Sequence, residues 1–398
     1  MKIHRKNPGQ PVVALFDLDG VLIRPGGYRA AVEASINYFS ERMGLGKQAP
    51  AEEDVALMEA CGITSEWDMV PIFLAIMLEN ISKLQSNALP DCSLLDLIPK
   101  IAEKDIHLER SYRQAILELA QYLNPSISPA EAILLAIENG KLMDSLKGKT
   151  FGRDLLGQTR SIAASLSTRV FQTYILGDEG FSANYGMAPD FQSESLLSKN
   201  DRCLLNPEDR KLIQHLIDQK VIRASVITAR PSLPPAFGKD GKNVYSPEGE
   251  MALKLTGLED ISLIGYGTIQ YLAGRTGVSP DSLLKPSPVQ ALAAIASAFS
   301  RDERNALSWS AAIVGLEPLD ERLVDLPSSF KIHIFEDSPI GILSSQSAAA
   351  LLNRKNFNVA VNAWGISTNQ DKIRALEAVG ARVFPDIHQA LEAAFQAD

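Results

Sequence analysis

The chain is poor in the residues that build disulfide frameworks and zinc sites. Only three of its 398 residues are cysteine, Cys61, Cys92 and Cys203, and no two of them have CxxC spacing. An odd, widely separated set supports neither a disulfide framework nor a zinc site. The five histidines are also scattered, without the spacing of a metal site. We therefore expect a protein of a reducing compartment, with a cytoplasmic location.

Positive charge and long apolar runs are also scarce. Lys and Arg total 39 against 48 for Asp and Glu, a net charge of -9 at pH 7, which opposes binding to a phosphate backbone. The richest apolar run, residues 70–78, is about half as long as a bilayer span and predicts a buried helix. Basic residues 1–6 lead into Asn-Pro-Gly, not into the apolar stretch of an export signal. We expect neither a nucleic acid nor a membrane partner.

What is present is ordinary globular composition, with 45% hydrophobic and 22% charged residues, in a chain long enough for two or three domains. Short apolar runs that end at a polar residue or glycine are typical of buried parallel strands. Patterns typical of helices, such as 207–219, 288–299 and 371–379, lie between them. The alternation predicts an α/β fold with a Rossmann-like parallel sheet. The runs are residues 12–16, 224–227, 261–264, 332–335 and 359–361.

The region between the first strand and the second has a different pattern, because apolar residues recur there at helical spacing. The segments concerned are 28–43, 68–84, 108–123, 129–136 and 161–175. We therefore predict an α/β core formed by residues 1–23 and 205–398, interrupted by a large all-α domain at residues 24–204. Residues 301–327 are expected to form an extra loop of the core. Gly265-Tyr266-Gly267 lacks the third glycine of a dinucleotide-binding fingerprint.

Polar residues close several of the predicted strands, at the sheet edge where parallel α/β proteins bind ligands. Taken singly, each has an ordinary structural role: aspartates form turns, a threonine caps a helix, and a lysine is a solvated surface charge. Taken together they form a set suited to phosphoryl transfer. The set comprises Asp17, Asp19, Thr228, Lys285, Glu336 and Asp337.

The physical reason is charge. If Asp17, Asp19, Glu336 and Asp337 converge, they require a cation to remain ionised, and Mg²⁺ prefers a ligand set made only of oxygens. A bound phosphate could then contact the metal, Lys285, the Thr228 hydroxyl and backbone amides such as that of Ala229. The sequence thus predicts a magnesium cofactor and a phosphorylated ligand.

These residues resemble, in the correct order, the four motifs of the haloacid dehalogenase-like (HAD) superfamily. The matching segments are 16–22, 226–230, Lys285 with its Pro-x-Pro context, and 335–342. The resemblance implies that Asp17 is a nucleophile that forms an aspartyl-phosphate and that Asp19 is the acid and base. It also implies that Mg²⁺ is held by Asp17, Glu336, Asp337 and the backbone carbonyl of Asp19. Thr228 and Lys285 would bind the phosphoryl group.

The helical region resembles the C1 cap of subfamily I of this superfamily, in the branch of phosphoglycolate phosphatase-like and phosphomutase-like proteins. Residues 62–68, with Tyr28-Arg29, also resemble a segment of an uncharacterised subgroup. Tyr28, Trp67 and Asp68 are therefore candidates to contact substrate, although an aromatic beside an apolar helix is also typical of a core. For Arg230 and Ser338 a place beside the phosphate and a structural salt bridge or cap remain alternatives.

The function expected from these residues is Mg²⁺-dependent hydrolysis of a small phosphorylated metabolite. A phosphomutase is one alternative, since it would use the same Asp17 and Asp19. A binding or regulatory protein that has kept the HAD core is another.

Overall fold

The structure, a computed structural model, describes residues 10–85, 89–124, 127–235, 244–318, 320 and 323–395. It divides into two compact units: unit 1 is made of Met1–Pro25 and Asp201–Asp398, and unit 2 is Gly26–Asn200. A short antiparallel ribbon of β2 (Ile23–Arg24) and β3 (Arg202–Cys203) belongs to unit 1. Of the boundaries predicted from the sequence, 23/24 falls inside β2 and 204/205 falls one residue after the end of β3.

Unit 1 is built on a parallel sheet of six strands in the order β5-β4-β1-β6-β7-β8. The predicted α/β fold with a Rossmann-like sheet and an inserted helical region is confirmed. Four of the five apolar runs lie entirely in strands, the run 261–264 begins one residue before its strand, and the short strand β8 was not predicted. The strands are β1 (Val12–Asp17), β4 (Ile222–Ile227), β5 (Ser262–Ile264), β6 (Ser329–Glu336), β7 (Asn358–Ile366) and β8 (Arg382–Phe384).

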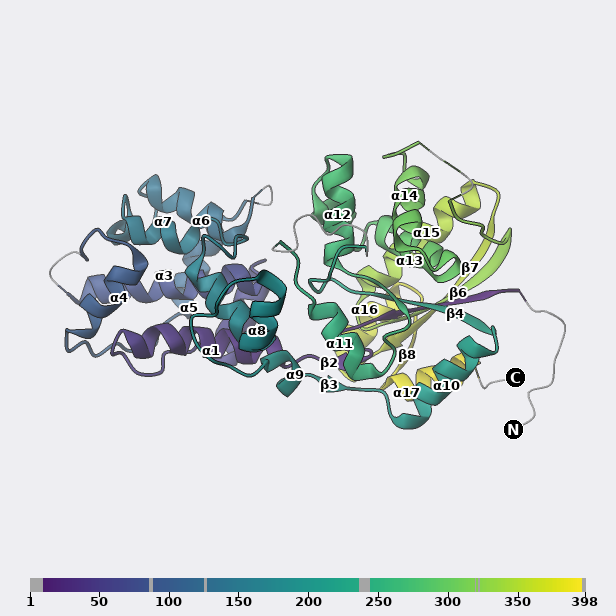
Figure 1. The fold of residues 1–398 in the computed structure, drawn as a ribbon, viewed down its shortest axis with the longest axis horizontal. Coiled ribbons are helices and arrows are strands. Elements are labelled where there is room, and N and C mark those ends of the chain that lie inside the picture. The colour runs from purple at the N-terminus through teal and green to yellow at the C-terminus, as the bar shows by residue number, and fades with distance from the viewer. Residues whose placement is uncertain are drawn as a thin grey trace. The chain divides into compact units, whose positions relative to one another are not determined.

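Helices cover both faces of this sheet (Figure 1). In β1, Val13 and Leu15 belong to one apolar core and Ala14 and Phe16 to the other, because successive side chains of a strand point to opposite faces. The first core packs against α12 (Tyr266–Thr276), α13 (Pro288–Ser300), α14 (Glu303–Ile313), α15 (Pro339–Arg354) and α16 (Gln370–Ala378). The second packs against α10 (Pro207–Asp218), α11 (Glu248–Thr256) and α17 (Ile387–Phe395).

The prediction of an extra loop at residues 301–327 was wrong for residues 303–313, which form helix α14. The described residues that follow, 314–318, 320 and 323–327, form neither helix nor strand, and 319, 321 and 322 lie outside the described residues. The Asp302 side chain caps this helix by accepting a hydrogen bond from the Asn305 backbone N–H at 2.9 Å. Ala306, Leu307 and Trp309 are buried in the first core. Their spacing is helical, so the helix could have been predicted from the apolar pattern.

Unit 2 consists of helices and their connections throughout its described residues. The predicted buried run 70–78 lies in α3, where all nine residues are buried. The helices are α1 (Gly27–Arg42), α2 (Glu52–Ala60), α3 (Glu66–Leu84), α4 (Leu94–Ala102), α5 (Arg113–Leu119), α6 (Pro129–Glu138), α7 (Thr150–Leu156), α8 (Leu166–Tyr185) and α9 (Leu196–Asn200).

Two of the predicted helices differ in extent. The helix predicted at 108–123 begins only at Arg113 and ends in a 3₁₀ turn, Ala120–Tyr122. The helix predicted at 161–175 is α8, which begins after Ser165 because that side chain accepts a hydrogen bond from the Thr168 N–H at 3.2 Å. Among the described residues, none of the helices combines the length and apolarity that crossing a bilayer requires.

Candidate functional site

The site lies at the carboxyl ends of three adjacent strands of unit 1. Asp17 is the last residue of β1 and Glu336 the last residue of β6, while Thr228 directly follows β4. Because β1 pairs in parallel with β4 on one side and β6 on the other, the three strand ends meet at one edge of the sheet. This is the edge at which parallel α/β folds bind ligands.

Three carboxylates come together there. Asp17, Glu336 and Asp337 each offer an oxygen, and these oxygens lie within 4.8 Å of one another. Gly20 provides the room, because a Cβ at this position would lie 2.5 Å from Oδ2 of Asp337, and its φ of +80° also favours glycine. A donor set made only of carboxylate oxygens fits Mg²⁺.

Lys285 supplies positive charge to this cluster. It lies just before α13, and its Nζ donates hydrogen bonds to Oδ1 of Asp17 at 2.6 Å and Oε1 of Glu336 at 2.5 Å. Burial raises the pKa of Asp17 well above its usual range; the charge of Glu336 adds to the rise and Lys285 opposes it. Burial disfavours the Lys285 ammonium, but the charges of Asp17 and Glu336 outweigh it and raise the pKa of Lys285. The lysine therefore stays charged against the two carboxylates.

Glu336 is fully buried and bound on both of its oxygens. Lys285 contacts Oε1, while the Ser338 N–H and hydroxyl donate to Oε2 at 3.3 and 3.1 Å. A Cβ on Gly341 would overlap Oε1, so glycine is required where α15 passes this carboxylate. Glu336 thus anchors Lys285 as well as belonging to the predicted metal-binding set. Ser338, whose role the sequence left open, contacts Glu336.

Thr228 and Ala229 form the next part of the site. Thr228 is buried and its Oγ1 accepts a hydrogen bond from the Arg230 N–H at 3.1 Å, whereas Ala229 is exposed. Sequence reasoning missed Gln290, a fully buried amide on α13 whose Nε2 donates to the carbonyls of Thr228 and Ile264, both at 2.8 Å. A single amide in a helix whose other polar residues are two serines was the available signal. Gln290 fixes the ends of β4 and β5 relative to each other.

The carboxylate of Asp19 is not part of this cluster of three, so the condition considered from the sequence, that four carboxylates converge, is not met. The predicted metal ligand of Asp19 is its backbone carbonyl, and that stays a prediction. Its carboxylate accepts hydrogen bonds from Nε of Arg230 at 3.1 and 2.8 Å and from Nη2 at 2.5 Å. The Nη1 of the same guanidinium donates to Asp201 at 2.7 Å. The fourth negative charge is therefore neutralised by an arginine. Asp201 was not predicted, and nothing in the local sequence distinguishes it.

Glycine is needed at positions 265 and 267 because both residues pack closely against the loop that carries Arg230. A Cβ on Gly265 would lie 2.5 Å from the Ser232 Oγ, and one on Gly267 would lie 1.8 Å from the Ser232 carbonyl oxygen. The Gly267 N–H donates to the Ser232 Oγ at 3.0 Å. These glycines let the start of α12 pack directly on the backbone after β4.

Lys372 is a second cation that the sequence did not indicate. It lies in the first turn of α16, and its Nζ is 2.7 Å from Oδ2 of Asp337. Its side chain is 54% exposed and that of Asp337 is 23% exposed. Water screens this pair, unlike the buried contacts of Lys285.

In unit 2, two of the three residues predicted to contact substrate, Trp67 and Asp68, both lie next to Arg160. Asp68 is fully buried, and its carboxylate accepts hydrogen bonds from Arg160 at 2.5 Å and from the Thr159 hydroxyl at 3.3 Å. The Arg160 guanidinium also lies 5.7 Å from the centre of the Trp67 ring. The third, Tyr28, is half-buried on α1. Burial and pairing give Asp68 a structural ion pair and leave its carboxylate closed to a substrate.

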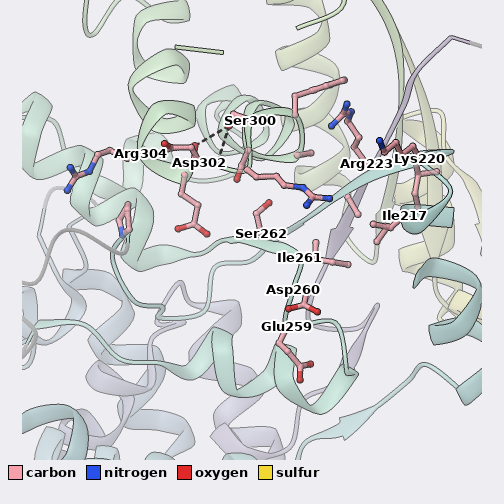
Figure 2. Close-up of a pocket in the computed structure, with 18 residues that line it drawn as sticks. Ile217, Lys220, Arg223, Glu259, Asp260, Ile261, Ser262, Ser300, Asp302 and Arg304 are labelled. Carbon is pink, nitrogen blue, oxygen red and sulfur yellow. Dashed lines mark hydrogen bonds between the residues drawn. The ribbon is translucent and has the colours of Figure 1, made fainter. Parts of the chain in front are cut away.

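A pocket of about 770 Å³ lies at the opposite end of the sheet, where β4 and β5 begin (Figure 2). Ile222 and Ser262, the first residues of these strands, line it together with Ser297 to Ser300 from the end of α13. Charged side chains of both signs surround it: Lys220, Arg223, Arg301, Arg304, Glu259, Asp260, Asp302 and Glu303. This pocket is separate from the carboxylate cluster, since the two lie at opposite ends of β4.

No family model matches the sequence, and no curated protein matches it. The chain is similar to an X-ray structure from the Northeast Structural Genomics Consortium, target ZR25, with a TM-score of 0.60, 14% identity and coverage of 97% of this chain and 99% of that one. It is also similar to phosphatase Tt82 from Thermococcus thioreducens, with a TM-score of 0.46, 15% identity and coverage of 92% and 99%. The first similarity shows a shared fold, and the second is too weak to carry an argument.

Proposed function

We propose that this protein is a Mg²⁺-dependent phosphatase that hydrolyses a phosphomonoester of a small metabolite through an aspartyl-phosphate on Asp17. The observation that carries the proposal is the position of Asp17: its carboxylate ends β1, is largely buried, contacts Lys285 and lies beside two further carboxylates. The resemblance of the surrounding segments to the HAD motifs supports the same reaction.

In the first step, a carboxylate oxygen of Asp17 attacks phosphorus and the ester P–O bond breaks. Asp19 would act here in its protonated form: the leaving oxygen takes its proton, Asp19 becomes the carboxylate that pairs with Arg230, and the phosphoryl group is now bonded to Asp17. Lys285 would stabilise the phosphoryl oxygens, as would the Thr228 hydroxyl and the backbone amide of Ala229. The exposure of Ala229 leaves that side of the strand end accessible.

In the second step, water attacks phosphorus and transfers a proton to Asp19. The bond between phosphorus and Asp17 breaks, which releases inorganic phosphate and restores both aspartates. Asp17 and Asp337, with Glu336, would hold the metal ion, whose charge would neutralise phosphoryl oxygens and carboxylates. Glu336 also holds Lys285 in place, because its Oε1 accepts a hydrogen bond from the Lys285 Nζ.

We further propose that unit 2 is the cap of a HAD-like enzyme and contributes to the choice of substrate. Its helices are inserted in the chain between β2 and β3, directly after the segment that carries Asp17 and Asp19. The helical composition and the point of insertion support this assignment. The two half-buried aromatics Tyr28 and Trp67 remain candidates for substrate contact, whereas Asp68 is occupied by Arg160.

The test is phosphate release from a panel of phosphorylated metabolites and a generic aryl phosphate, with Mg²⁺ or EDTA. Asp17→Asn should lower the rate by about three orders of magnitude or more, as losses of a nucleophile do. Asp209→Asn is the matched control, because Asp209 is also a buried carboxylate of unit 1 but pairs with His388. Release that persists in EDTA, or in a folded Asp17→Asn variant, would overturn the proposal.

A further inference from the structure

Arg230 is a buried guanidinium between two carboxylates, and its side chain is only 2% exposed. Nε and Nη2 bind both oxygens of Asp19, and Nη1 binds Asp201, whose side chain is fully buried. The planar fork of arginine favours such fixed, multidentate contacts. Asp201 holds one side of the fork and the other side binds Asp19.

The backbone that carries Arg230 is fixed as well. The Arg230 N–H donates to the Thr228 hydroxyl at 3.1 Å, and its carbonyl accepts from the Tyr266 N–H at 2.9 Å. The next carbonyl, that of Pro231, accepts from the Gly249 N–H at 2.8 Å. Neither the main chain nor the guanidinium can move without breaking several hydrogen bonds, so Arg230 is a rigid support for Asp19.

Asp19 needs such a support. It lies two positions after Asp17, and its side chain is 34% exposed. Without a cation of its own, this carboxylate would be drawn to any metal ion held by the neighbouring cluster of Asp17, Glu336 and Asp337. Asp19 would then be a metal ligand and would no longer be placed to exchange protons.

We propose that Arg230, anchored by Asp201, is the positioning residue that keeps Asp19 out of the metal cluster and orients it toward the leaving oxygen. This inference rests on the proposed function. Arg230 acts through Asp19 and makes no contact with the phosphoryl group. The chain therefore distinguishes its two neighbouring aspartates by their counter-ions, Lys285 for Asp17 and Arg230 for Asp19.

The experiment compares kcat/KM for two substrates that carry the same phosphoryl group on different leaving groups. One is 4-nitrophenyl phosphate, whose leaving group departs without a proton, and the other is the best alkyl phosphate of the panel. Arg230→Gln should lower kcat/KM for the alkyl phosphate about 100-fold, in the range of general acid catalysis, and for the aryl phosphate less than about tenfold. Arg230→Gln should thus lower the ratio of kcat/KM for the alkyl phosphate to kcat/KM for the aryl phosphate. Asp201→Asn should lower the same ratio by a smaller factor.

Further variants separate positioning from structural damage. Arg230→Lys keeps the charge but not the fork, so its ratio should lie near that of Arg230→Gln. In an Asp19→Asn background, Arg230→Gln should cause little further loss, because the residue it positions is already absent. Arg275→Gln is the matched control: Arg275 pairs with Glu317 at 2.8 Å in unit 1, away from the site, and its loss should leave the ratio unchanged.

Each other outcome overturns the inference. An equal loss for both substrates would make Arg230 a structural or phosphate-binding residue, and unchanged kinetics would show that Asp19 needs no support. Should Arg230→Gln not fold, Arg230→Lys and the isosteric Asp201→Asn decide the question. The proposed function is judged separately: if the unaltered protein releases no phosphate, or Asp17→Asn retains activity, that function fails and this inference fails with it.

Discussion

The Nζ of Lys285 lies 2.6 Å from Oδ1 of Asp17, although 268 residues separate the two in the chain. The contact places a buried positive charge on the proposed nucleophile and holds Glu336 on its other side. Attraction in this weakly solvated position offsets the cost of removing three charged groups from water. Removing any one of the three would therefore leave an uncompensated buried charge.

Lys285→Met removes the cation from two buried carboxylates. We expect the free energy of unfolding to fall by about 3 kcal/mol without Mg²⁺, because one partner of a buried pair is lost. The loss should be smaller in millimolar Mg²⁺, since a divalent cation replaces part of the missing charge. Urea unfolding with and without Mg²⁺ measures both, and Lys355→Met, at an exposed position, is the control. If the unfolding free energy falls equally with and without Mg²⁺, the metal ion does not replace the charge of Lys285.

Gly20→Ala should weaken Mg²⁺ binding about tenfold, as changes beside metal ligands do, because the new Cβ would displace Asp337. Gly380→Ala is a matched control: its φ is +84°, close to the +80° of Gly20, but nothing lies within 4 Å of its added Cβ. Both variants should lose about 1 kcal/mol of stability from strain at positive φ. Calorimetric titration with Mg²⁺ checks the difference, and equal affinities in the two variants would refute the role given to Gly20.

Lys372→Gln should raise the affinity for Mg²⁺ a few-fold, because Lys372 competes with the metal ion for Asp337. Stability should change by less than about 1 kcal/mol, since the lysine side chain is half exposed and the pair is screened by water. The Mg²⁺ concentration that gives half-maximal phosphate release is the measurement, with Lys355→Gln as control. An unchanged or raised half-saturating concentration would show that Lys372 does not oppose the metal.

His333→Gln should reduce the loss of stability in acid. Burial, assisted by Lys331, lowers the pKa of His333 to about 4, so between pH 6.5 and 4 the unfolded chain binds a proton that the folded one does not. Stability is therefore lost as the pH falls through this window, by about 3 kcal/mol at pH 4. Urea unfolding at pH 7 and 4.5 should show a weaker pH dependence in the variant.

His388 provides a control of opposite sign. Its hydrogen bond to Asp209 raises its pKa, so its contribution is present below pH 6.5 and is lost as the pH rises through the raised pKa. His388→Gln should therefore lose stability in acid and little above neutrality. If the unfolding free energies of the natural protein and His333→Gln run parallel from pH 7 to 4.5, His333 is not buried in its neutral form.

The sequence by itself determined the parallel sheet, the helical insertion and the residues at the strand ends. A buried parallel strand can be recognised from its own run of apolar residues. Asp17, Thr228 and Glu336 each directly follow such a run, and Asp337 is the next residue after Glu336. These features are local, so a single pass along the chain could find them. Helix α14 was equally local, and its apolar spacing was available but was overlooked.

Only the tertiary structure decided which charges share a counter-ion. Arg230 pairs with Asp19 and Asp201, Lys372 with Asp337, and Arg160 with Asp68, and these partners come from different elements of the fold. Any of the chain's acidic residues could in principle neutralise a given lysine or arginine, because Coulomb attraction carries no sequence signal. The packing within each unit brings particular pairs within hydrogen-bond distance, and in unit 1 that geometry excludes Asp19 from the cluster that contains Asp17.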